Sequence, residues 1–450
     1  MYSQKLYGKN LQNMTVNTEY EILARQEDMI NRCFRCGLCR TVCPSFEDTG
    51  IESASPRGRI QFARAVITHK SDLDKAVQIR MLDCLNCMRC TEVCPAGVRT
   101  NEIVLAARAE LVKRGKLHII KKLVFNTVLK SPFFMTFFSQ VASLGQRWFY
   151  NSNTLFESLI PSLAGMEDKK FPSLADKLPT DRLPMVIPAE SGNKIKRVGY
   201  FIGCATNLIF TDVADATIHV LSHNSIEVVV PRGQVCCGVP AYTSGDFNTA
   251  RKLAERNLKT FRNLNVDCIV TDCASCSAAL KHEIRELIGI EPFDVPVYDL
   301  NEFLVNIIDI KRDFGEVHMK VTYHDPCHLK RGQNIHREPR ELLKMVPGIE
   351  FVEMKEADRC CGGAGTFSFT HHTLSRKVGA HKVENIRNTG AEYVSTPCPS
   401  CKMQLDDLIC HEGIDVHTIH PVQVLDTAYR NYGSQFHTPL SLSYEKVDVS

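Results

Sequence analysis

Residues 33–44 read CFRCGLCRTVCP, and residues 84–95 read CLNCMRCTEVCP. Both stretches follow one spacing, Cys-x2-Cys-x2-Cys-x3-Cys-Pro. Thiols this close together suit metal ligation better than disulfide pairing, and residues 1–10 lack the apolar core of an export signal. The two stretches therefore predict a pair of metal sites in a protein that works in a reducing compartment.

This spacing is typical of proteins that hold two [4Fe–4S] clusters. In such runs the first three cysteines surround one cluster, and the fourth, before proline, ligates the other. Zinc sites favour paired cysteines instead, and no Cys-x2-Cys here is followed by the histidine that haem attachment needs. We therefore expect one cluster on Cys33, Cys36, Cys39 and Cys94, and a second on Cys84, Cys87, Cys90 and Cys43.

Ten further cysteines form two copies of a second pattern, in which a Cys-Cys-Gly turn lies between a single cysteine and a Cys-x2-Cys pair. The copies are Cys204, Cys236, Cys237, Cys273 and Cys276, and Cys327, Cys360, Cys361, Cys398 and Cys401. Equivalent positions are 123, 124 and 125 residues apart along the chain. A nearly constant offset indicates that one domain has been duplicated.

Each copy also alternates strand-like and helix-like segments, and its cysteines follow the strands. The expected strands are 198–202, 226–230 and 268–271 in the first copy, and 320–324, 349–354 and 393–395 in the second. Helical periodicity covers 211–222, 247–264, 338–345 and 373–389. Because ligand sites in open parallel α/β sheets form at the carboxyl ends of strands, we expect a metal site there in each copy.

Five thiols exceed the needs of a cube-shaped four-iron cluster. They suit either a larger, open iron cluster with a bridging thiolate, or a tetrahedral zinc with one spare cysteine, and the residues alone leave both open. Gly238 and Gly362 follow the two Cys-Cys pairs. We expect these glycines to let the backbone turn tightly beside the metal.

The domain organisation follows from these motifs. Residues 1–115 are expected to form an α-helical ferredoxin domain, with helical composition at 61–68 and 70–81. Residues 116–195 form a cysteine-free connector that ends in a Pro-rich linker. Residues 196–318 and 319–450 are the two α/β repeats, the second with a C-terminal tail. The predicted fold class is α+β multidomain: a helical ferredoxin domain followed by a duplicated α/β cysteine-rich (CCG) domain.

The connector is also the candidate membrane- or partner-facing surface. No stretch has the roughly 18 apolar residues of a transmembrane helix, but Ser131 to Gln146 carries four phenylalanines and no charge. It can form an interfacial hairpin with the preceding segment, or pack on the protein itself or a partner subunit, which composition favours. With a net charge of +3 and scattered basic residues, nucleic acid is not an expected partner. We expect a cytoplasmic protein, with peripheral attachment to the cytoplasmic face of the membrane as the alternative.

The combined order of motifs resembles a known superfamily. Both ferredoxin runs, residues 55–60 (SPRGRI), and both Cys-x31/32-Cys-Cys-Gly-x34/35-Cys-x2-Cys modules look like the iron–sulfur subunit of glycolate oxidase. The lactate-utilisation iron–sulfur protein and the corresponding iron–sulfur subunits of anaerobic glycerol-3-phosphate dehydrogenase and heterodisulfide reductase share this layout. The resemblance implies two [4Fe–4S] clusters in the ferredoxin domain and one or two non-cubane [4Fe–4S] clusters on five cysteines each, with zinc possible at one repeat. Cys268 and Cys410 match no module and are expected to be buried.

The chain carries no nucleotide-binding G-x-G-x-x-G after a strand and no Ser/His/Asp arrangement, so we assign no catalytic residue. We expect an electron-transfer subunit. A flavoprotein dehydrogenase for a glycolate- or lactate-type hydroxy acid, or an electron-transfer flavoprotein, would supply electrons to the ferredoxin clusters, and the CCG domain would pass them to an acceptor such as quinone.

Two alternatives remain. A catalytic subunit would reduce a disulfide at a non-cubane cluster, as in heterodisulfide reductase, whereas a zinc-stabilised scaffold would have no redox role in the repeats. His324 and His328 flank Cys327 and can donate hydrogen bonds to cluster sulfurs or simply pack at a strand end. Arg57 and Arg59 can lie over a ferredoxin cluster or pair with acids such as Glu52.

Overall fold

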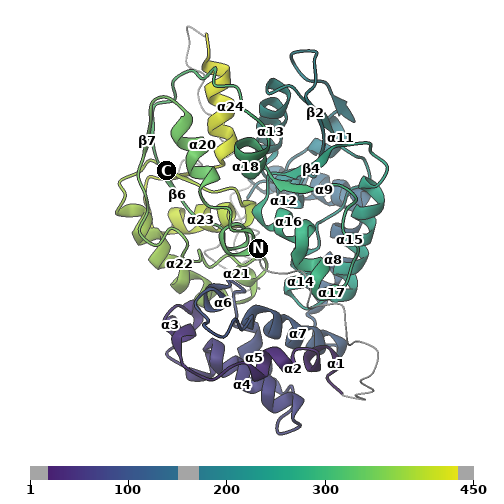
Figure 1. Ribbon diagram of the computed structural model, residues 1–450, viewed down its shortest axis with the longest axis vertical. Helices are drawn as coiled ribbons and strands as arrows, with labels where there is room; N and C mark the ends of the chain where they lie inside the picture. Colours follow the sequence, from purple (N-terminus) through teal and green to yellow (C-terminus); the bar gives the residue numbers. More distant parts are fainter. Residues whose placement is uncertain (1–18, 151–171, 434–450) are drawn as a thin grey trace.

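The computed structural model describes residues 19–150 and 172–433 (Figure 1). Three segments with sequence-based expectations lie outside the described residues: the N-terminal residues 1–10, part of the connector, and the C-terminal tail. The ferredoxin domain forms one end of the molecule, and the two repeats lie side by side on top of it (Figure 1). Among the described helices, none combines the length and the apolar character that crossing a bilayer requires.

The ferredoxin domain consists of short helices around a small core. Ser55 caps the helix Pro56–Ile67 by accepting a hydrogen bond from the Gly58 N–H, and Asp74 caps the helix Lys75–Leu82 by accepting one from the Val77 N–H. The elements are α1 Glu21–Ala24, α2 Glu27–Asn31, η1 Leu38–Arg40, α3 Pro44–Thr49, η2 Glu52–Ala54, α4 Pro56–Ile67, α5 Lys75–Leu82, α6 Arg89–Glu92 and α7 Thr100–Lys113.

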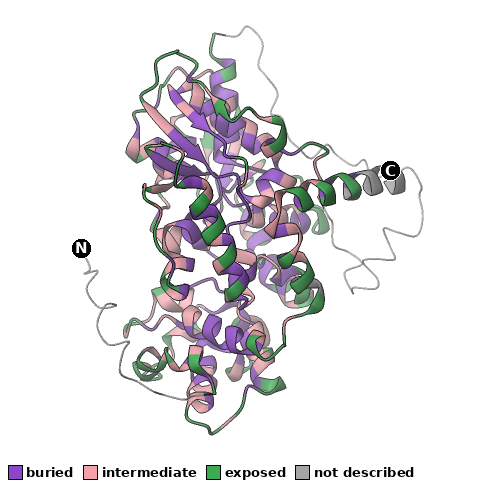
Figure 2. Ribbon diagram, turned by 90° about the vertical axis from the view of Figure 1, so that its right-hand side faces the viewer, coloured by how far each residue is buried: buried purple, intermediate pink, exposed green. Residues whose placement is uncertain are grey.

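The connector contributes α8 Ile119–Asn126, η3 Val128–Lys130, α9 Pro132–Tyr150 and α11 Pro179–Arg182. The described part of α9 projects from the body of the molecule (Figure 2). Beyond α11, the short strand β1 Val186–Ile187 pairs antiparallel with the first repeat. The sheet of that repeat therefore includes residues of the segment 116–195.

The first repeat has a five-stranded sheet in the order β1-β3-β2-β4-β5. Strands β2 to β5 are parallel, and strand β4, which lies between β2 and β5, is buried along its whole length. Its elements are β2 Lys196–Tyr200, α12 Cys204–Leu208, α13 Thr211–His223, β3 Ile226–Val229, α14 Val239–Thr243, α15 Phe247–Phe261, β4 Cys268–Thr271, α16 Ala274–Ala278, the π-helical η4 Ala279–Glu283, α17 Ile284–Ile288, β5 Val297–Asp299, α18 Leu300–Glu302 and the π-helical η5 Phe303–Ile307.

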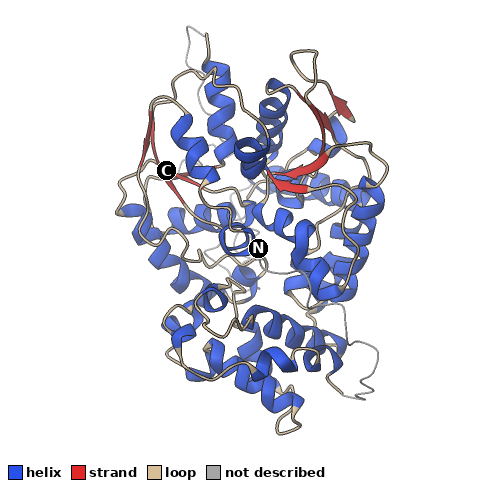
Figure 3. Ribbon diagram, in the orientation of Figure 1, coloured by secondary structure: helices blue, strands red, loops and turns tan. Residues whose placement is uncertain are grey.

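The second repeat has a four-stranded parallel sheet in the order β7-β6-β8-β9, the same arrangement without the β1 edge (Figure 3). Its elements are β6 Met319–Tyr323, α19 Cys327–Gln333, α20 Glu338–Met345, β7 Ile349–Phe351, α21 Phe367–Thr370, α22 His372–Arg387, β8 Tyr393–Ser395, α23 Pro399–His411, β9 His417–Ile419 and α24 Pro421–Asn431. The duplication and the α+β class are confirmed.

The two repeats share one hydrophobic core. Side chains from both sheets and from the facing helices α13 and α24 form a single buried cluster, with Val198, Leu221 and Phe303 from the first repeat and Val321, Leu425 and Tyr429 from the second. Burial of apolar surface on this scale fixes the repeats against each other. Cysteines that follow the strands of both repeats then line one cavity together with Leu85 of the ferredoxin domain.

Candidate metal centres

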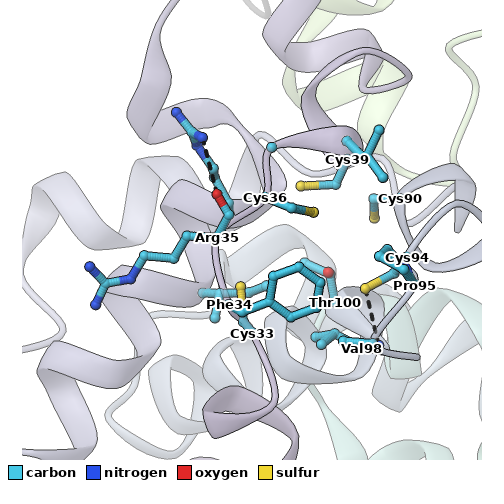
Figure 4. A pocket seen from close by; sticks show the side chains of 15 residues that line it. Cys33, Phe34, Arg35, Cys36, Cys39, Cys90, Cys94, Pro95, Val98 and Thr100 are labelled. Carbon is cyan, nitrogen blue, oxygen red and sulfur yellow. Dashed lines mark hydrogen bonds between the residues drawn. The ribbon is translucent and has the colours of Figure 1, made fainter.

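The four cysteines expected to hold the first cluster line one small chamber. Cys33, Cys36 and Cys39 come from the loop before α3, and Cys94 comes from the end of the second run (Figure 4). The chamber has a volume of about 20 Å³. The Val98 N–H donates to the Cys94 Sγ at 3.3 Å. Cys36 is exposed, so this chamber opens at the protein surface.

The remaining four ferredoxin cysteines line a second chamber, also of about 20 Å³, formed by Cys43, Cys84, Cys87 and Cys90. Cys90 lines both chambers, so the two sites are neighbours. The Asn86 N–H donates to the Cys84 Sγ at 3.4 Å. The structure thus brings the cysteines together in the two predicted groups, although their role as ligands remains a prediction.

Two arginines from the SPRGRI segment take different positions. Arg57 pairs with Glu52 at 2.6 Å and covers the first chamber, where its guanidinium lies 3.0 Å from the point at which a Cβ on Gly37 would stand. Arg59 is 1% exposed, and its Nη1 lies 3.9 Å from the Cys43 Sγ. A buried cation at that distance offsets negative charge that builds up on the second site.

The donor set of these chambers fits an iron–sulfur cluster. Burial raises the pKa of the Cys39 and Cys87 thiols to about 11 each. By themselves these thiols would stay protonated at neutral pH, whereas a bound metal deprotonates a coordinating thiol outright. Four converging sulfurs with N–H donors aimed at them therefore match the needs of a metal–thiolate centre.

In the first repeat, five cysteines gather where strands β2, β3 and β4 end. Cys276 lies 3.3 Å from Cys237, measured between their Sγ atoms. Cys236 contacts Cys204 and Cys237, and Cys273 contacts Cys276. The φ angle of Gly238 is +100°, and its N–H donates to the Cys236 Sγ at 3.5 Å. The glycine thus permits the left-handed turn that brings both adjacent thiols to one site.

The second repeat reproduces this arrangement. Gly362 has a φ angle of +85°, and its N–H donates to the Cys360 Sγ at 3.5 Å. A Cβ at this glycine would lie 2.4 Å from the Ser375 carbonyl oxygen, so the tight turn requires glycine. The site gathers Cys327, Cys360, Cys361, Cys398 and Cys401.

The structure separates the two histidines that flank Cys327. His324 lies in the second site, where one of its ring nitrogens and the Sγ atoms of Cys361 and Cys401 are all within 4.8 Å of one another. His328 instead reaches across to the first repeat, where its Nδ1 lies 3.0 Å from the Glu283 Oε2. Burial by itself would lower the pKa of His328, but Glu283 outweighs burial and raises it to about 9.

Both repeat sites open into one cavity of about 610 Å³. Nine of the ten repeat cysteines line it, and Cys84 of the ferredoxin domain reaches it too. The first repeat's Cys273 contacts Cys398 of the second, so the two thiol sets meet. The lining contains Arg108, Lys116 and Lys121 in addition to His328, and it includes no aspartate or glutamate.

The second ferredoxin chamber adjoins the second repeat. Leu85 and Cys87 pack in one buried cluster with Cys360 and Phe367, and Cys327 lies against it. Ion pairs hold this contact: Arg331 bonds Glu92 at 2.7 Å and also pairs with Asp358, and Arg359 bonds Glu47 at 2.8 Å. Arg331 and Arg359 were missed at the level of sequence, because their partners in the ferredoxin domain lie 239 and 312 residues away and leave no local pattern.

The two unassigned cysteines differ from each other. Cys268 is buried within β4, as expected. Cys410 is exposed near the end of α23, so the expectation that it is buried was wrong. Its position on the outer face of an amphipathic helix explains the error, since a single cysteine on a helix carries no signal of which face it occupies.

Two family models match the chain. A "4Fe-4S dicluster domain" covers residues 29–98, and a "Cysteine-rich domain" matches twice, at residues 198–281 and 321–406. The matched ranges contain all eight ferredoxin cysteines and all ten repeat cysteines. These domains indicate that the chain carries iron–sulfur clusters.

Similar proteins extend over nearly the whole chain. The "Probable glycolate oxidase iron-sulfur subunit" of Bacillus subtilis is 30% identical over 431 residues, which cover 91% of this chain and 96% of the relative. A subunit of the fumarate reductase (CoM/CoB) of Methanothermobacter marburgensis is 30% identical and covers 88% of this chain and 72% of its own length. A subunit of the dihydromethanophenazine:CoB--CoM heterodisulfide reductase of Methanosarcina barkeri is 28% identical, with coverages of 84% and 88%. The chain therefore belongs to the family of iron–sulfur proteins in which a 4Fe-4S dicluster domain precedes two cysteine-rich domains.

Proposed function

We propose that this chain is the electron-transfer subunit of an oxidoreductase complex, and that it passes single electrons from a flavoprotein dehydrogenase to an acceptor at the cysteine-rich repeats. One observation carries the proposal: the cysteine sites form a continuous series through the molecule. The series begins at the exposed Cys36 in the first chamber and continues through Cys90, which lines both ferredoxin chambers. From Cys87 in the second chamber it passes to Cys360 of the second repeat. It ends at the contact between Cys398 and Cys273.

The proposed cofactors are two [4Fe–4S] clusters in the ferredoxin domain and one non-cubane [4Fe–4S] cluster in each repeat, with zinc at one repeat as the alternative. When bound, such clusters accept and release one electron at a time without moving a substrate. The protein's own groups would set their potentials. The N–H donors at Asn86, Val98, Gly238 and Gly362 and the buried guanidinium of Arg59 all favour the more negative, reduced state.

The names of the relatives support an oxidoreductase complex and suggest the type of donor. A glycolate oxidase acts on a small hydroxy acid, so a flavoprotein dehydrogenase for a glycolate- or lactate-type substrate, or an electron-transfer flavoprotein, is the partner that we propose. The chain itself would bind neither the hydroxy acid nor the flavin. We propose that substrate recognition lies on the partner and electron storage on this chain.

The acceptor would bind in the cavity between the repeats. Each ferredoxin chamber has a volume of about 20 Å³, whereas the cavity between the repeats has a volume of about 610 Å³. Repeat clusters of the same size as the ferredoxin clusters would therefore leave most of this cavity free. Its walls combine apolar side chains such as Leu85, Leu117 and Phe367 with the basic side chains of the lining. Space of this size and character suits a small organic acceptor such as a quinone.

A quinone acceptor would place the protein at a membrane, and the connector offers a surface for that contact. Phe133, Phe137 and Leu123 are 71%, 56% and 64% exposed on α9 and α8. Residues 111–156 contain seven lysines and arginines and no acidic residue. Exposed aromatic side chains beside basic ones favour attachment to an anionic bilayer surface. Exchange of Phe133 and Phe137 for serine should release the protein from anionic vesicles in a sedimentation assay, whereas unchanged sedimentation would make this surface a packing element or a subunit interface.

The alternative function is reduction of a disulfide in the same cavity, in the manner that a heterodisulfide reductase performs. A specific observation favours it: thiol sets from both repeats face one space, and His324 and His328 stand at its wall. A disulfide that bridged this space would be within reach of both sites. The isolated, metal-loaded chain should then reduce a small disulfide with electrons from a chemical reductant, which a pure electron carrier would not do.

The main experiment measures iron, sulfide and zinc in the anaerobically purified chain, together with EPR spectra of its oxidised and reduced forms. Four clusters require about sixteen irons and a repeat-specific signal that disappears in Cys361→Ser. About eight irons with zinc would confine electron transfer to the ferredoxin domain and overturn the proposed role of the repeats.

A further inference from the structure

The surface around Cys36 differs from the rest of the ferredoxin domain in its apolar exposure. Cys36 is exposed, whereas the other seven ferredoxin cysteines are buried or half-buried. Phe34 is 63% and Leu38 50% exposed, and both line the mouth of the first chamber together with the exposed Pro95 (Figure 4). A cluster of solvent-exposed apolar side chains at the rim of a site commonly marks a surface to which another molecule binds.

The same surface is strongly basic. The side chains of Arg32 and Arg35 are exposed and have no hydrogen bond or ion pair within the described part of the chain. Arg40 and Arg57 share a single carboxylate, Glu52, at 3.2 and 2.6 Å. Four guanidinium groups against one carboxylate leave three positive charges on this surface, although the whole chain has a net charge of only +3. The lining of the chamber contains no acidic residue.

These features select one kind of partner. A basic rim around an apolar centre attracts a surface that carries acidic side chains around an apolar patch. Electron tunnelling weakens steeply with distance, so a partner that exchanges electrons gains most by contact where a cysteine site reaches the surface. Transient redox complexes also need only a small interface, typically below about 1,200 Å² in total, which a patch of this kind can supply.

We propose that the surface formed by Phe34, Leu38 and Pro95 with Arg32, Arg35, Arg40 and Arg57, here called the Cys36 face, docks an acidic redox protein that exchanges electrons at the first chamber. This inference rests on the proposed electron-transfer function and gives it a point of entry. The apolar side chains would exclude water from the contact, and the arginines would orient the partner and speed its approach. Phe34 and the arginines are positioning residues, because they lie beside the chamber rather than among its sulfurs.

The test uses the full chain, loaded with iron and sulfide, and photoreduced flavodoxin as an acidic redox probe in a stopped-flow instrument. The variant Arg32→Glu/Arg35→Glu should lower the second-order rate of electron exchange at low salt by about tenfold or more, since electrostatic steering raises such rates by about 10 to 10³. The salt dependence of the rate should flatten in the same variant. The variant Phe34→Ala should slow exchange several-fold at both low and high salt.

A matched control carries the same change of charge elsewhere. Lys252→Glu/Lys259→Glu alters two exposed lysines on α15 of the first repeat and should leave the rate within twofold. EPR spectra of all variants should match the parent, which shows that the clusters are intact. An equal loss of rate in the control, or no loss in Arg32→Glu/Arg35→Glu, overturns the docking proposal.

Reduction by photoreduced deazaflavin, a small-molecule donor, separates this proposal from the proposed function. If deazaflavin reduces the clusters but the variants of the Cys36 face exchange electrons with flavodoxin at the rate of the parent, the docking site is wrong and the electron-transfer function stands. If no repeat signal appears with either donor, the proposed route through the chain fails. Loss of vesicle binding or of self-association in Arg32→Glu/Arg35→Glu, with no change in electron exchange, would assign the face to a membrane or to a second copy instead.

Discussion

The two cysteine-rich repeats hold the same five thiols and the same glycine turn, yet their surroundings differ. At the position of His324 in the second repeat, the first repeat has the buried Phe201, and at the position of His328 it has Ala205. The second repeat also carries the ion-paired contact with the ferredoxin domain through Arg331 and Arg359. Duplication therefore preserved the arrangement of the thiols, whereas the surroundings of each site diverged, and such surroundings set the reduction potential of a cluster bound there.

The contact with the ferredoxin domain shows the same asymmetry. Opposite charges meet at the second repeat, where Glu92 and Glu47 face Arg331 and Arg359. Carboxylates meet at the first repeat, where Glu102 of α7 lies near Glu283 and Glu286. The ferredoxin domain also packs on the first repeat, through the buried Leu105 and a hydrogen bond from Arg108 to the Thr243 carbonyl oxygen, so the two contacts differ in their charges. Because Cys87 packs with Cys360, electrons from the second ferredoxin chamber are expected to enter the CCG domain at the second repeat.

The largest effect should come from removing one thiol in each repeat. Cys361→Ser and Cys237→Ser should each lower the iron content by about four atoms per chain if both repeats hold iron. Cys361→Ser should also stop electrons from reaching the first repeat, whereas Cys237→Ser should leave the second repeat reducible. Iron analysis and EPR during stepwise reduction check this. Normal reduction of the first repeat in Cys361→Ser would contradict the order of the sites.

Loss of the buried arginine at the second-repeat contact should have the next largest effect. The Arg331 side chain is 2% exposed and pairs with Glu92 and Asp358. Arg331→Ala removes this buried guanidinium, although Asp358 keeps Lys330 at 2.9 Å, and should destabilise the protein by about 2 kcal/mol. The midpoint of urea denaturation, followed by cluster absorbance, measures the change. The exposed pair of Arg262 with Asp294 in the first repeat provides a control, because Arg262→Ala should cost less than about 1 kcal/mol.

The carboxylate contact at the first repeat predicts a pH dependence. Burial raises the pKa of Glu102 to about 7, with Glu286 and Glu283 adding to the shift and Arg99 opposing it. The folded state therefore favours the protonated acid, and ionisation of Glu102 removes stability progressively as the pH rises from its ordinary pKa of 4.5 to about 7.

Glu102→Gln should accordingly stabilise the protein by about 1–2 kcal/mol at pH 8 and change little at pH 4.5. Thermal denaturation at both pH values measures the difference. The exposed Glu255→Gln should show no such pattern. If Glu102→Gln and the parent are equally stable at pH 8, the ionised Glu102 carboxylate does not destabilise the contact with the first repeat, and the prediction is wrong.

The smallest effect is expected from substitutions that exchange a residue beside one repeat site for its counterpart in the other repeat. His324→Phe copies the first repeat and removes a hydrogen-bond donor beside Cys361 and Cys401, so the potential of the second site should fall. A decrease of about 59 mV would change electron sharing between the sites tenfold for a one-electron step. EPR-monitored redox titration measures it, and Phe201→His should shift the first site in the opposite direction. No shift in either variant would make His324 a packing residue.

Strong local patterns in the sequence predicted several of the motif-bearing elements accurately. Segments 226–230, 268–271 and 393–395 are strands within one residue of the expected bounds, and 338–345 is the helix α20. The strands β1, β5 and β9 were missed, because two or three residues show no period and these strands, unlike the equally short β8, do not lead into a cysteine motif. Their pairing depends on neighbours that lie elsewhere in the chain.

The cysteine spacing was enough to predict the chemistry: eighteen cysteines in an order typical of metal sites, their grouping into two runs and two repeats, and the glycines that the turns require. These follow from spacing, because ligand geometry imposes local constraints on a short stretch of chain. Only the folded chain shows that both repeats face one cavity, that the second repeat adjoins Cys87, that Arg331 and Arg359 pair with the ferredoxin domain, and that Glu102 of that domain lies near Glu283 and Glu286. Those contacts join residues that are hundreds of positions apart, and only the packing of the folded domains brings them within the few ångströms at which charge and hydrogen bonding act.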